Sequence, residues 1–194
     1  SFIIIWLLFM TGLRFGEAQA LEWDSDIDLE EKTLTVNKSM YYKSANEFYV
    51  TEPKTRAGNR TIALDDNTID YLKTWKAIQI KNIMFSKYVL SYNGLPTNKS
   101  TTKHIIERHS KLAGVHKIKT HALRHSHASL LISLGENAIV VRDRLGHEDI
   151  ETTLGTYGHL YPNTNKEVAK KLNNLITVKK DDKIAIISSN RPEY

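Results

Sequence analysis

The chain has no cysteine among its 194 residues. Disulfide bonds and thiolate metal sites are therefore excluded, and a reducing cytoplasm is the expected compartment. A long hydrophobic run is also missing. The most apolar stretch, residues 2–10, is followed closely by Arg14, whereas a membrane-spanning helix needs about 20 apolar residues. With no basic leader and no small-residue cleavage site, this stretch is interpreted as a buried core helix whose upstream partner is absent, and no membrane association is expected.

Positive charge is unevenly distributed along the chain. The net charge is +5, but residues 1–40 hold 3 basic and 7 acidic side chains, whereas residues 41–194 hold 24 basic and 15 acidic ones. A basic excess over most of a folded body favours a polyanionic partner such as double-stranded DNA.

Hydrophobic periodicity predicts a fold that is α+β and mainly α. Three segments rich in Val, Tyr, Phe, Thr and Ile (33–41, 47–51 and 60–64) predict a small antiparallel three-stranded sheet joined by turns at 43–46 and 53–59. The other periodic segments predict helices over residues 2–11, 13–23, 67–84, 100–112, 120–134, 137–145, 149–154 and 165–176.

Residues 120–161 carry a dense set of polar groups on these helices. Arg124 lies near the start of a helix with His121 three residues earlier on the same face, so both could hold one phosphate. His147 follows Gly146 at a helix end, where it could donate to a phosphate or cap the helix. Tyr157 lies between two glycines, which would give its backbone freedom, and beside these cations it is a candidate nucleophile.

Two other uses of the same residues remain open at this point. His121 and His125 have the spacing of two metal ligands on one helical face, but Ala122 replaces the glutamate of an H-E-x-x-H motif, and no metal or other cofactor is expected. Residues 128–145 could instead form a helix-turn-helix that places Arg142 and Arg144 on DNA without catalysis.

Over residues 1–176 the sequence resembles the tyrosine recombinase (phage integrase) family. Four segments carry the resemblance, in the order expected for the family: TGLRFGEAQAL (11–21), PKTRAGNR (53–60), THALRHSHASLL (120–131) and LGHEDIETTLGTYGHL (145–160). The resemblance implies six catalytic residues and a supporting carboxylate, namely Arg14, Lys54, His121, Arg124, His147, Tyr157 and the partner Glu17.

The resemblance also implies a mechanism. Tyr157 would attack a DNA phosphodiester to give a 3′-phosphotyrosyl link and a free 5′-hydroxyl. Arg14 and Arg124 would clamp the non-bridging oxygens, and His147 would hydrogen-bond the phosphate. His121 would help to take the tyrosine proton.

Lys54 would protonate the leaving oxygen, with Arg56 as a neighbouring cation on the same turn. Because one ester is exchanged for another, the reaction requires neither ATP nor a metal ion. Direct DNA contacts are expected from Arg56, Arg60, Lys119 and His125. His125, His127 and His159 are interpreted as packing or DNA-backbone contacts rather than as catalytic groups, and Tyr161 is a decoy for the nucleophile.

The expected domain organisation is a catalytic domain over residues 1–176 and a tail over 177–194, with the family's N-terminal DNA-binding domains absent. The tail, including the KIAII segment (183–187), or the helix at 165–176 is expected to pack on a neighbouring subunit in a homo-oligomer, a tetramer on DNA, with accessory DNA-bending or directionality proteins as further partners. The expected function is integration and excision of a phage or an integrative or conjugative transposon. A type IB topoisomerase-like or dimer-resolving recombinase and a non-catalytic helix-turn-helix regulator are the alternatives.

Overall fold

The computed structural model describes residues 2–44, 47–53, 55–83, 86–161 and 165–175. The chain divides into two compact units, residues 1–161 and residues 162–194. Within the second unit the described residues form helix α9 (Asn165–Leu175), which exposes Val168 and Leu172 one turn apart. The KIAII segment and the rest of the expected tail lie outside the described residues.

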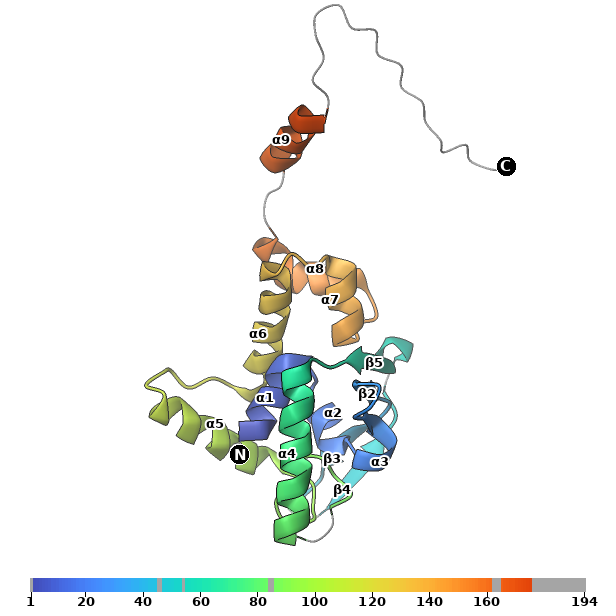
Figure 1. Cartoon of the computed structure of the whole chain (residues 1–194), viewed down its shortest axis with the longest axis vertical. Coiled ribbons are helices and arrows are strands. Elements are labelled where there is room, and N and C mark those ends of the chain that lie inside the picture. Colours follow the sequence, from blue (N-terminus) through green and yellow to red (C-terminus); the bar gives the residue numbers. More distant parts are fainter. Residues whose placement is uncertain (1, 45–46, 54, 84–85, 162–164, 176–194) are drawn as a thin grey trace, which may run out of the picture. The chain divides into compact units, whose positions relative to one another are not determined.

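Helices make up most of the first unit (Figure 1). Their bounds are α1 Phe2–Thr11, α2 Phe15–Ala20, α3 Trp23–Asp26, α4 Asp66–Ile83, α5 Lys99–Leu112, α6 Thr120–Ser133, α7 Ala138–Leu145 and α8 Ile150–Tyr157, with 3-10 turns η1 (Arg56–Gly58) and η2 (Gly158–Leu160).

The mainly α class is confirmed, and two helix predictions need correction. The helix expected over residues 13–23 is two helices, α2 and α3, because Leu21 and Glu22 have extended backbone angles between them. The short helix expected at 149–154 continues to Tyr157. Gly155 is therefore part of a helix and gives the tyrosine no loop-like freedom.

The strands form two small antiparallel sheets instead of one. Strands β1 (Ile27–Asp28), β2 (Thr33–Val36) and β5 (Arg60–Ala63) make a three-stranded sheet in the order β1-β2-β5, and β3 (Ser39–Tyr42) pairs with β4 (Phe48–Thr51). The expected three-stranded antiparallel sheet is therefore present, but its strand pairing is different. The strand predicted over residues 33–41 is interrupted at Lys38, whose ammonium lies 2.9 Å from the buried carboxylate of Asp26.

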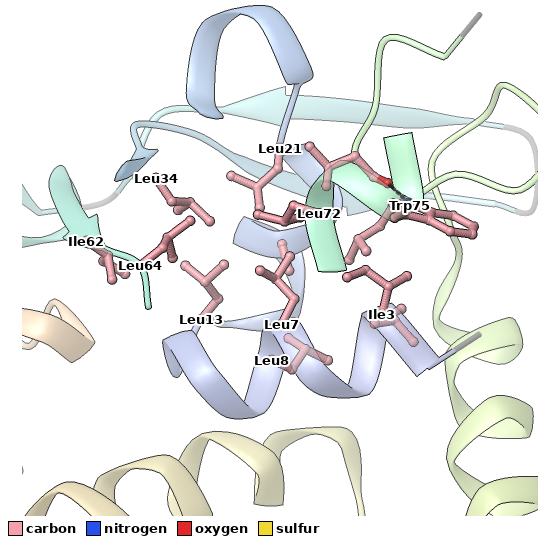
Figure 2. Packing of buried hydrophobic residues seen from close by; sticks show 14 of the residues in the cluster. Ile3, Leu7, Leu8, Leu13, Leu21, Leu34, Ile62, Leu64, Leu72 and Trp75 are labelled. Atoms are coloured by element: carbon pink, nitrogen blue, oxygen red, sulfur yellow. Dashed lines mark hydrogen bonds between the residues drawn. The ribbon is translucent and has the colours of Figure 1, made fainter. Parts of the chain in front are cut away.

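The apolar segment at the start of the chain is the centre of the main core, as predicted. Ile3, Ile4, Leu7 and Leu8 of α1 are at most 5% exposed. They pack with residues of α4 and of the three-stranded sheet, including Leu72 and others labelled in Figure 2. Burying each such side chain contributes about 1.5–3 kcal/mol, which explains a run that is apolar on every face. Within the described part of the chain, no helix has the length and apolar character needed to cross a membrane.

A second, smaller core holds α6, α7 and α8 together. It contains Ala128 and Ile132 of α6, Val141 and Leu145 of α7, and Tyr157 of α8. The ring of Tyr157 is thus a packing element as well as a candidate nucleophile, and its position depends on how these three helices meet.

Candidate active site

Arg14 and Glu17 are joined at the amino end of α2. The Arg14 backbone N–H donates to Glu17 Oε2 (2.9 Å), and its guanidinium Nη1 donates to Glu17 Oε1 (2.8 Å). A carboxylate in the first turn of a helix is favoured by the unpaired N–H groups and the helix dipole. The Arg14 side chain remains 44% exposed, whereas Glu17 is 6% exposed. The buried Glu17 therefore holds the guanidinium of Arg14 in place, and the exposed part of the Arg14 side chain is accessible to a ligand.

Arg60 holds the same carboxylate from the other side. Its Nη2 lies 2.8 Å from Glu17 Oε2, and its Nη1 donates to Gly58 O (3.1 Å). The Arg60 side chain is only 7% exposed. The expectation that Arg60 contacts DNA is therefore replaced by an internal role, because its Nε, Nη1 and Nη2 atoms all donate to acceptors of the protein. Burial alone would raise the pKa of Glu17, but the contacts with Arg60 and Arg14 outweigh burial and hold that pKa below its usual value.

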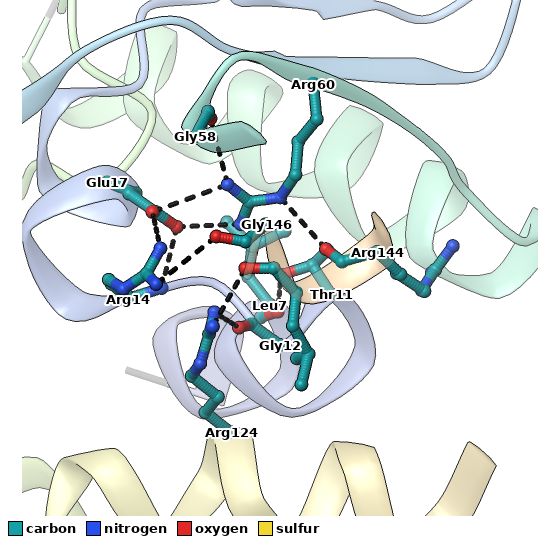
Figure 3. A network of polar contacts seen from close by, with 11 residues as sticks. Leu7, Thr11, Gly12, Arg14, Glu17, Gly58, Arg60, Arg124, Arg144 and Gly146 are labelled. Atoms are coloured by element: carbon teal, nitrogen blue, oxygen red, sulfur yellow. Dashed lines mark hydrogen bonds and ion pairs between the residues drawn. The ribbon is translucent and has the colours of Figure 1, made fainter. Parts of the chain in front are cut away.

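The carboxyl end of α7 is the point at which three arginines converge (Figure 3). The last carbonyl groups of a helix lack partners within the helix and carry partial negative charge. Here three consecutive carbonyls each accept a hydrogen bond from a different arginine. The pairs are Arg60 Nε with Arg144 O (2.9 Å), Arg124 Nη2 with Leu145 O (2.8 Å) and Arg14 Nη2 with Gly146 O (3.4 Å).

Arg124 is the most deeply placed of the three. It extends from α6, is 3% exposed, and its Nη1 donates to Gly12 O (2.7 Å). Burial, followed by repulsion from Arg14, lowers the pKa of Arg124 to about 10, which leaves it charged at neutral pH. The carbonyls on which it rests fix the plane of its guanidinium, as recognition of a phosphate through two parallel bonds requires.

Gly146 permits this convergence and places His147. Gly146 has φ 68°, in the left-handed region, and ends α7. A Cβ atom here would lie 2.7 Å from Arg60 Nη1 and 2.8 Å from Ala57 O. His147 follows, and its Nδ1 lies 2.9 Å from Thr153 Oγ1. Burial, then repulsion from Arg124 and Arg14, lowers the pKa of His147 to about 4.

Tyr157 ends α8 and is 4% exposed. Its hydroxyl lies 2.8 Å from Nδ1 of His125 on α6. Burial raises the pKa of Tyr157, and the charge of Arg124 opposes this shift. The neutral hydroxyl of Tyr157 therefore lies beside a histidine nitrogen, with the charge of Arg124 nearby.

His121 contacts His125 rather than the tyrosine. The two rings lie edge to face with their centroids 4.7 Å apart. Among the described residues, the hydrogen bond of the Tyr157 hydroxyl goes to His125, and none joins it to His121. Burial, with the nearby His125, Arg124 and Arg14, lowers the pKa of His121. The expected proton acceptor and the residue that contacts the nucleophile are therefore different histidines.

The predicted turn at 53–59 lies beside Arg14. Lys54 lies outside the described residues, so its expected role stays a prediction. A cavity of about 370 Å³ lies between Arg14 and this turn, and it is lined by Arg14, Glu17, Ser39, Tyr41, Glu52, Pro53, Thr55 and Gly58. Arg56 and Lys119 are both exposed, at positions compatible with their expected contacts to DNA.

The helix-turn-helix interpretation fits this structure poorly. Arg144 faces inward: it donates to Met10 O and Ala63 O (both 3.2 Å) and to His127 Nε2 (3.1 Å). Arg142 pairs with its neighbour Asp143 at 2.6 Å. Arg144, which such a motif would place on DNA, is thus engaged within the protein, whereas Arg142 pairs at the surface. No cluster of three or more His, Asp or Glu side chains suited to a metal ion occurs among the described residues.

Two residues of this site were missed or misassigned by sequence reasoning. Arg60 carries no local pattern that predicts a buried partner 43 positions away. His125 did carry a signal, since it shares a face of α6 with His121, four residues earlier. The spacing identifies the pair, but only the packing of α6 on α8 decides which member reaches the tyrosine.

Comparisons with known proteins identify the family of the chain. The model of the phage integrase family matches residues 2–164. The ICEBs1 integrase of Bacillus subtilis (strain 168) is 37% identical over 177 residues, which are 87% of this chain and 47% of that protein. The integrase of Staphylococcus phage L54a is 28% identical over 180 residues, covering 86% of this chain and 50% of that protein.

A solved structure shows the same fold. The Tn1549 transposon integrase in complex with a circular intermediate DNA superposes with a TM-score of 0.73 at 23% identity, over 90% of this chain and 57% of that one. The chain spans about half the length of the curated relatives it matches. With the four expected segments present and the family model covering most of the sequence, the chain belongs to the phage integrase family.

Proposed function

We propose that this chain is the catalytic part of a site-specific DNA recombinase, which cuts and rejoins DNA through a 3′-phosphotyrosyl intermediate. One observation carries the proposal. Arg14 and Arg124, from separate elements, converge on the carboxyl end of α7 next to His147, while Tyr157 presents its hydroxyl from α8. A phosphate bound to the two arginines would lie near His147, which could also bind it, and near the Tyr157 hydroxyl, which could attack it.

The proposed chemistry uses preorganised charge. Arg14 and Arg124 hold the non-bridging oxygens, where negative charge increases as Tyr157 attacks the phosphorus atom. Because their guanidinium groups are already fixed by Glu17 and by backbone carbonyls, little reorganisation is needed in the transition state. Losing one such donor costs about 10² to 10³ in rate.

The leaving group is the 5′-oxygen of the broken strand. Lys54, which lies between Pro53 and Thr55 in the sequence, is proposed to protonate it as the general acid. No cofactor has a place in this exchange of one phosphodiester for another. The names of the relatives, an integrase of a mobile element and a phage integrase, support integration and excision as the purpose of the reaction.

Double-stranded DNA is the proposed substrate, and the Tn1549 integrase was solved in complex with DNA. Exposed Arg56 and Lys119 are proposed to contact its backbone.

We propose further that residues 1–176 form the catalytic domain. The protein is proposed to act as a homo-oligomer on DNA, a tetramer, with α9 or residues 177–194 packing on a neighbouring subunit. Accessory DNA-bending or directionality proteins are proposed to act with it, in a bacterial host cell.

The test is covalent capture of DNA. The chain is incubated with nicked duplexes from a random-sequence pool, and protein–DNA adducts that survive denaturation are sequenced. The proposal expects adducts attached at a 3′-phosphate, with a free 5′-hydroxyl that polynucleotide kinase can label. Binding without any adduct would favour a DNA-binding role instead. Relaxation of supercoiled plasmid without strand exchange between duplexes would favour the topoisomerase-like alternative.

A further inference from the structure

We propose that His125 is the catalytic base that accepts the proton of Tyr157, and that His121 positions it. The inference rests on the proposed function and goes beyond it by assigning the proton to one atom, Nδ1 of His125. The observation behind it is the 2.8 Å contact between this nitrogen and the Tyr157 hydroxyl. This distance is within the range in which a base can abstract a proton directly.

The surroundings of His125 suit this role. It follows Arg124 on α6, so the base and the deepest phosphate-binding arginine are fixed to the same helix. His125 is exposed, whereas Tyr157 is 4% exposed. A proton taken from the buried hydroxyl can therefore leave to solvent through the imidazole. The hydroxyl itself has little direct access to water.

His121 limits the orientation of the base. Its ring lies edge to face with that of His125, with centroids 4.7 Å apart and planes at 84°. The ring of His125 also lies 5.7 Å from that of Tyr157. His125 is thus placed between the two, and its Nδ1 is directed at the hydroxyl. His121 reaches the nucleophile only through His125.

The proposed cleavage step transfers one proton to His125 and exchanges one phosphodiester bond for another. The O–H bond of Tyr157 breaks and its proton moves to Nδ1 of His125, giving an imidazolium. The phenolate oxygen forms a bond to phosphorus, and the bond from phosphorus to the 5′-oxygen breaks, that oxygen taking a proton from the general acid. On rejoining, the 5′-hydroxyl gives its proton back to the deprotonated general acid, its oxygen displaces Tyr157 from phosphorus, and the imidazolium returns its proton to the phenolate.

A purely structural role makes a different prediction. If His125 only anchors the hydroxyl by a hydrogen bond, an asparagine at this position preserves the contact, since its side-chain amide lies near the place of Nδ1. If His125 accepts the proton, asparagine fails because an amide is not basic at neutral pH. Removing a general base typically lowers the rate by about 10² to 10⁴.

The experiment measures the rate of adduct formation on a nicked duplex captured by the wild-type chain. We expect His125→Asn and His125→Ala each to be slower by at least about 100-fold. Imidazole added to His125→Ala should restore at least a tenth of the wild-type rate, and more basic imidazoles of similar size should restore more. His116→Asn, in an exposed loop, is the matched control and should cleave at the wild-type rate.

Two outcomes would overturn the assignment while leaving the proposed function intact. One is a His125→Asn chain that cleaves within about threefold of wild type. The other is rescue by imidazole in His121→Ala but not in His125→Ala, which would identify His121 as the base. Failure of the proposed function itself looks different, because the wild-type chain would then form no adduct at all.

Discussion

The Arg60 guanidinium and the Glu17 carboxylate form an ion pair of 2.8 Å in which both side chains are almost completely buried. Glu17 also holds Arg14, and Arg60 also holds the carbonyl of Arg144 at the end of α7. One buried pair therefore links the amino end of α2, strand β5 and the end of α7. The position of the exposed Arg14 depends on this link.

We expect Arg60→Met to destabilise the fold strongly. The substitution leaves the Glu17 carboxylate buried without its main partner, and breaking a buried pair in this way typically costs about 3–5 kcal/mol. Urea unfolding measures the change in free energy of unfolding. Lys43→Met is the matched control, because the Lys43–Glu47 pair is 69% and 59% exposed and should contribute less than about 1 kcal/mol. Equal losses in the two variants would contradict the role given to Arg60.

Gly146→Ala tests the crowded end of α7. Alanine at φ 68° is strained, and its Cβ would meet Arg60 Nη1 at 2.7 Å. Gly135→Ala is the control: Gly135 has φ 90°, but a Cβ there would meet nothing within 4 Å. Both variants should lose about 1–2 kcal/mol for the backbone conformation.

Only Gly146→Ala should also displace Arg60 and slow adduct formation. Unfolding in urea and the rate of cleavage, measured on both variants, separate strain from displacement. A Gly135→Ala chain that is as slow in cleavage as Gly146→Ala would show that backbone strain alone explains the loss.

His127 predicts a dependence of stability on pH. Burial, then Arg144, lowers the pKa of His127 from 6.5 to about 4, and its Nε2 accepts a hydrogen bond from Arg144. The unfolded chain therefore binds a proton at this residue below pH 6.5, whereas the folded chain binds it only near pH 4. The stability that the neutral imidazole confers is complete above pH 6.5 and is lost as the pH falls towards 4.

The loss should approach about 3 kcal/mol over this interval, since one pKa unit corresponds to about 1.4 kcal/mol. Urea unfolding at several pH values between 7 and 4.5 measures the slope. His127→Gln should flatten the slope by up to one proton, and His116→Gln, at an exposed position, should not change it. Identical slopes in wild type and His127→Gln would rule out His127 as a source of the acid sensitivity.

The helices and their ends could be predicted, because they depend on residues that are close together in the sequence. The apolar run at residues 2–10 is the core helix, and Asn137 and Gly146 mark the start and end of α7. The hairpin across the turn at 43–46 was predicted correctly, since β3 pairs with β4. The pairing of β5 with β2 was not, because it joins segments that are not consecutive in the sequence and no local periodicity shows it.

In the candidate site, too, the identities of several residues could be predicted from the sequence, whereas their contacts could not. The resemblance of its four segments to the family implied Arg14, Arg124, His147 and Tyr157, and the structure brings these into one region of the first unit. It could not show that Arg60 points inward, because that depends on a carboxylate from α2 and a carbonyl from α7 meeting at one place. Such placement is a property of packing between distant elements.

Tyr157 is the proposed nucleophile, and the nearby Tyr161 is the most stringent control for this assignment. Tyr161 packs against the same small core, and its hydroxyl is buried with no hydrogen-bond partner among the described residues. The most direct measurement is covalent capture of a nicked duplex by Tyr157→Phe and Tyr161→Phe, each compared with wild type. We expect no adduct with Tyr157→Phe and a DNA-linked peptide containing Tyr157 with Tyr161→Phe, whereas an adduct that survives Tyr157→Phe would show that another residue is the nucleophile.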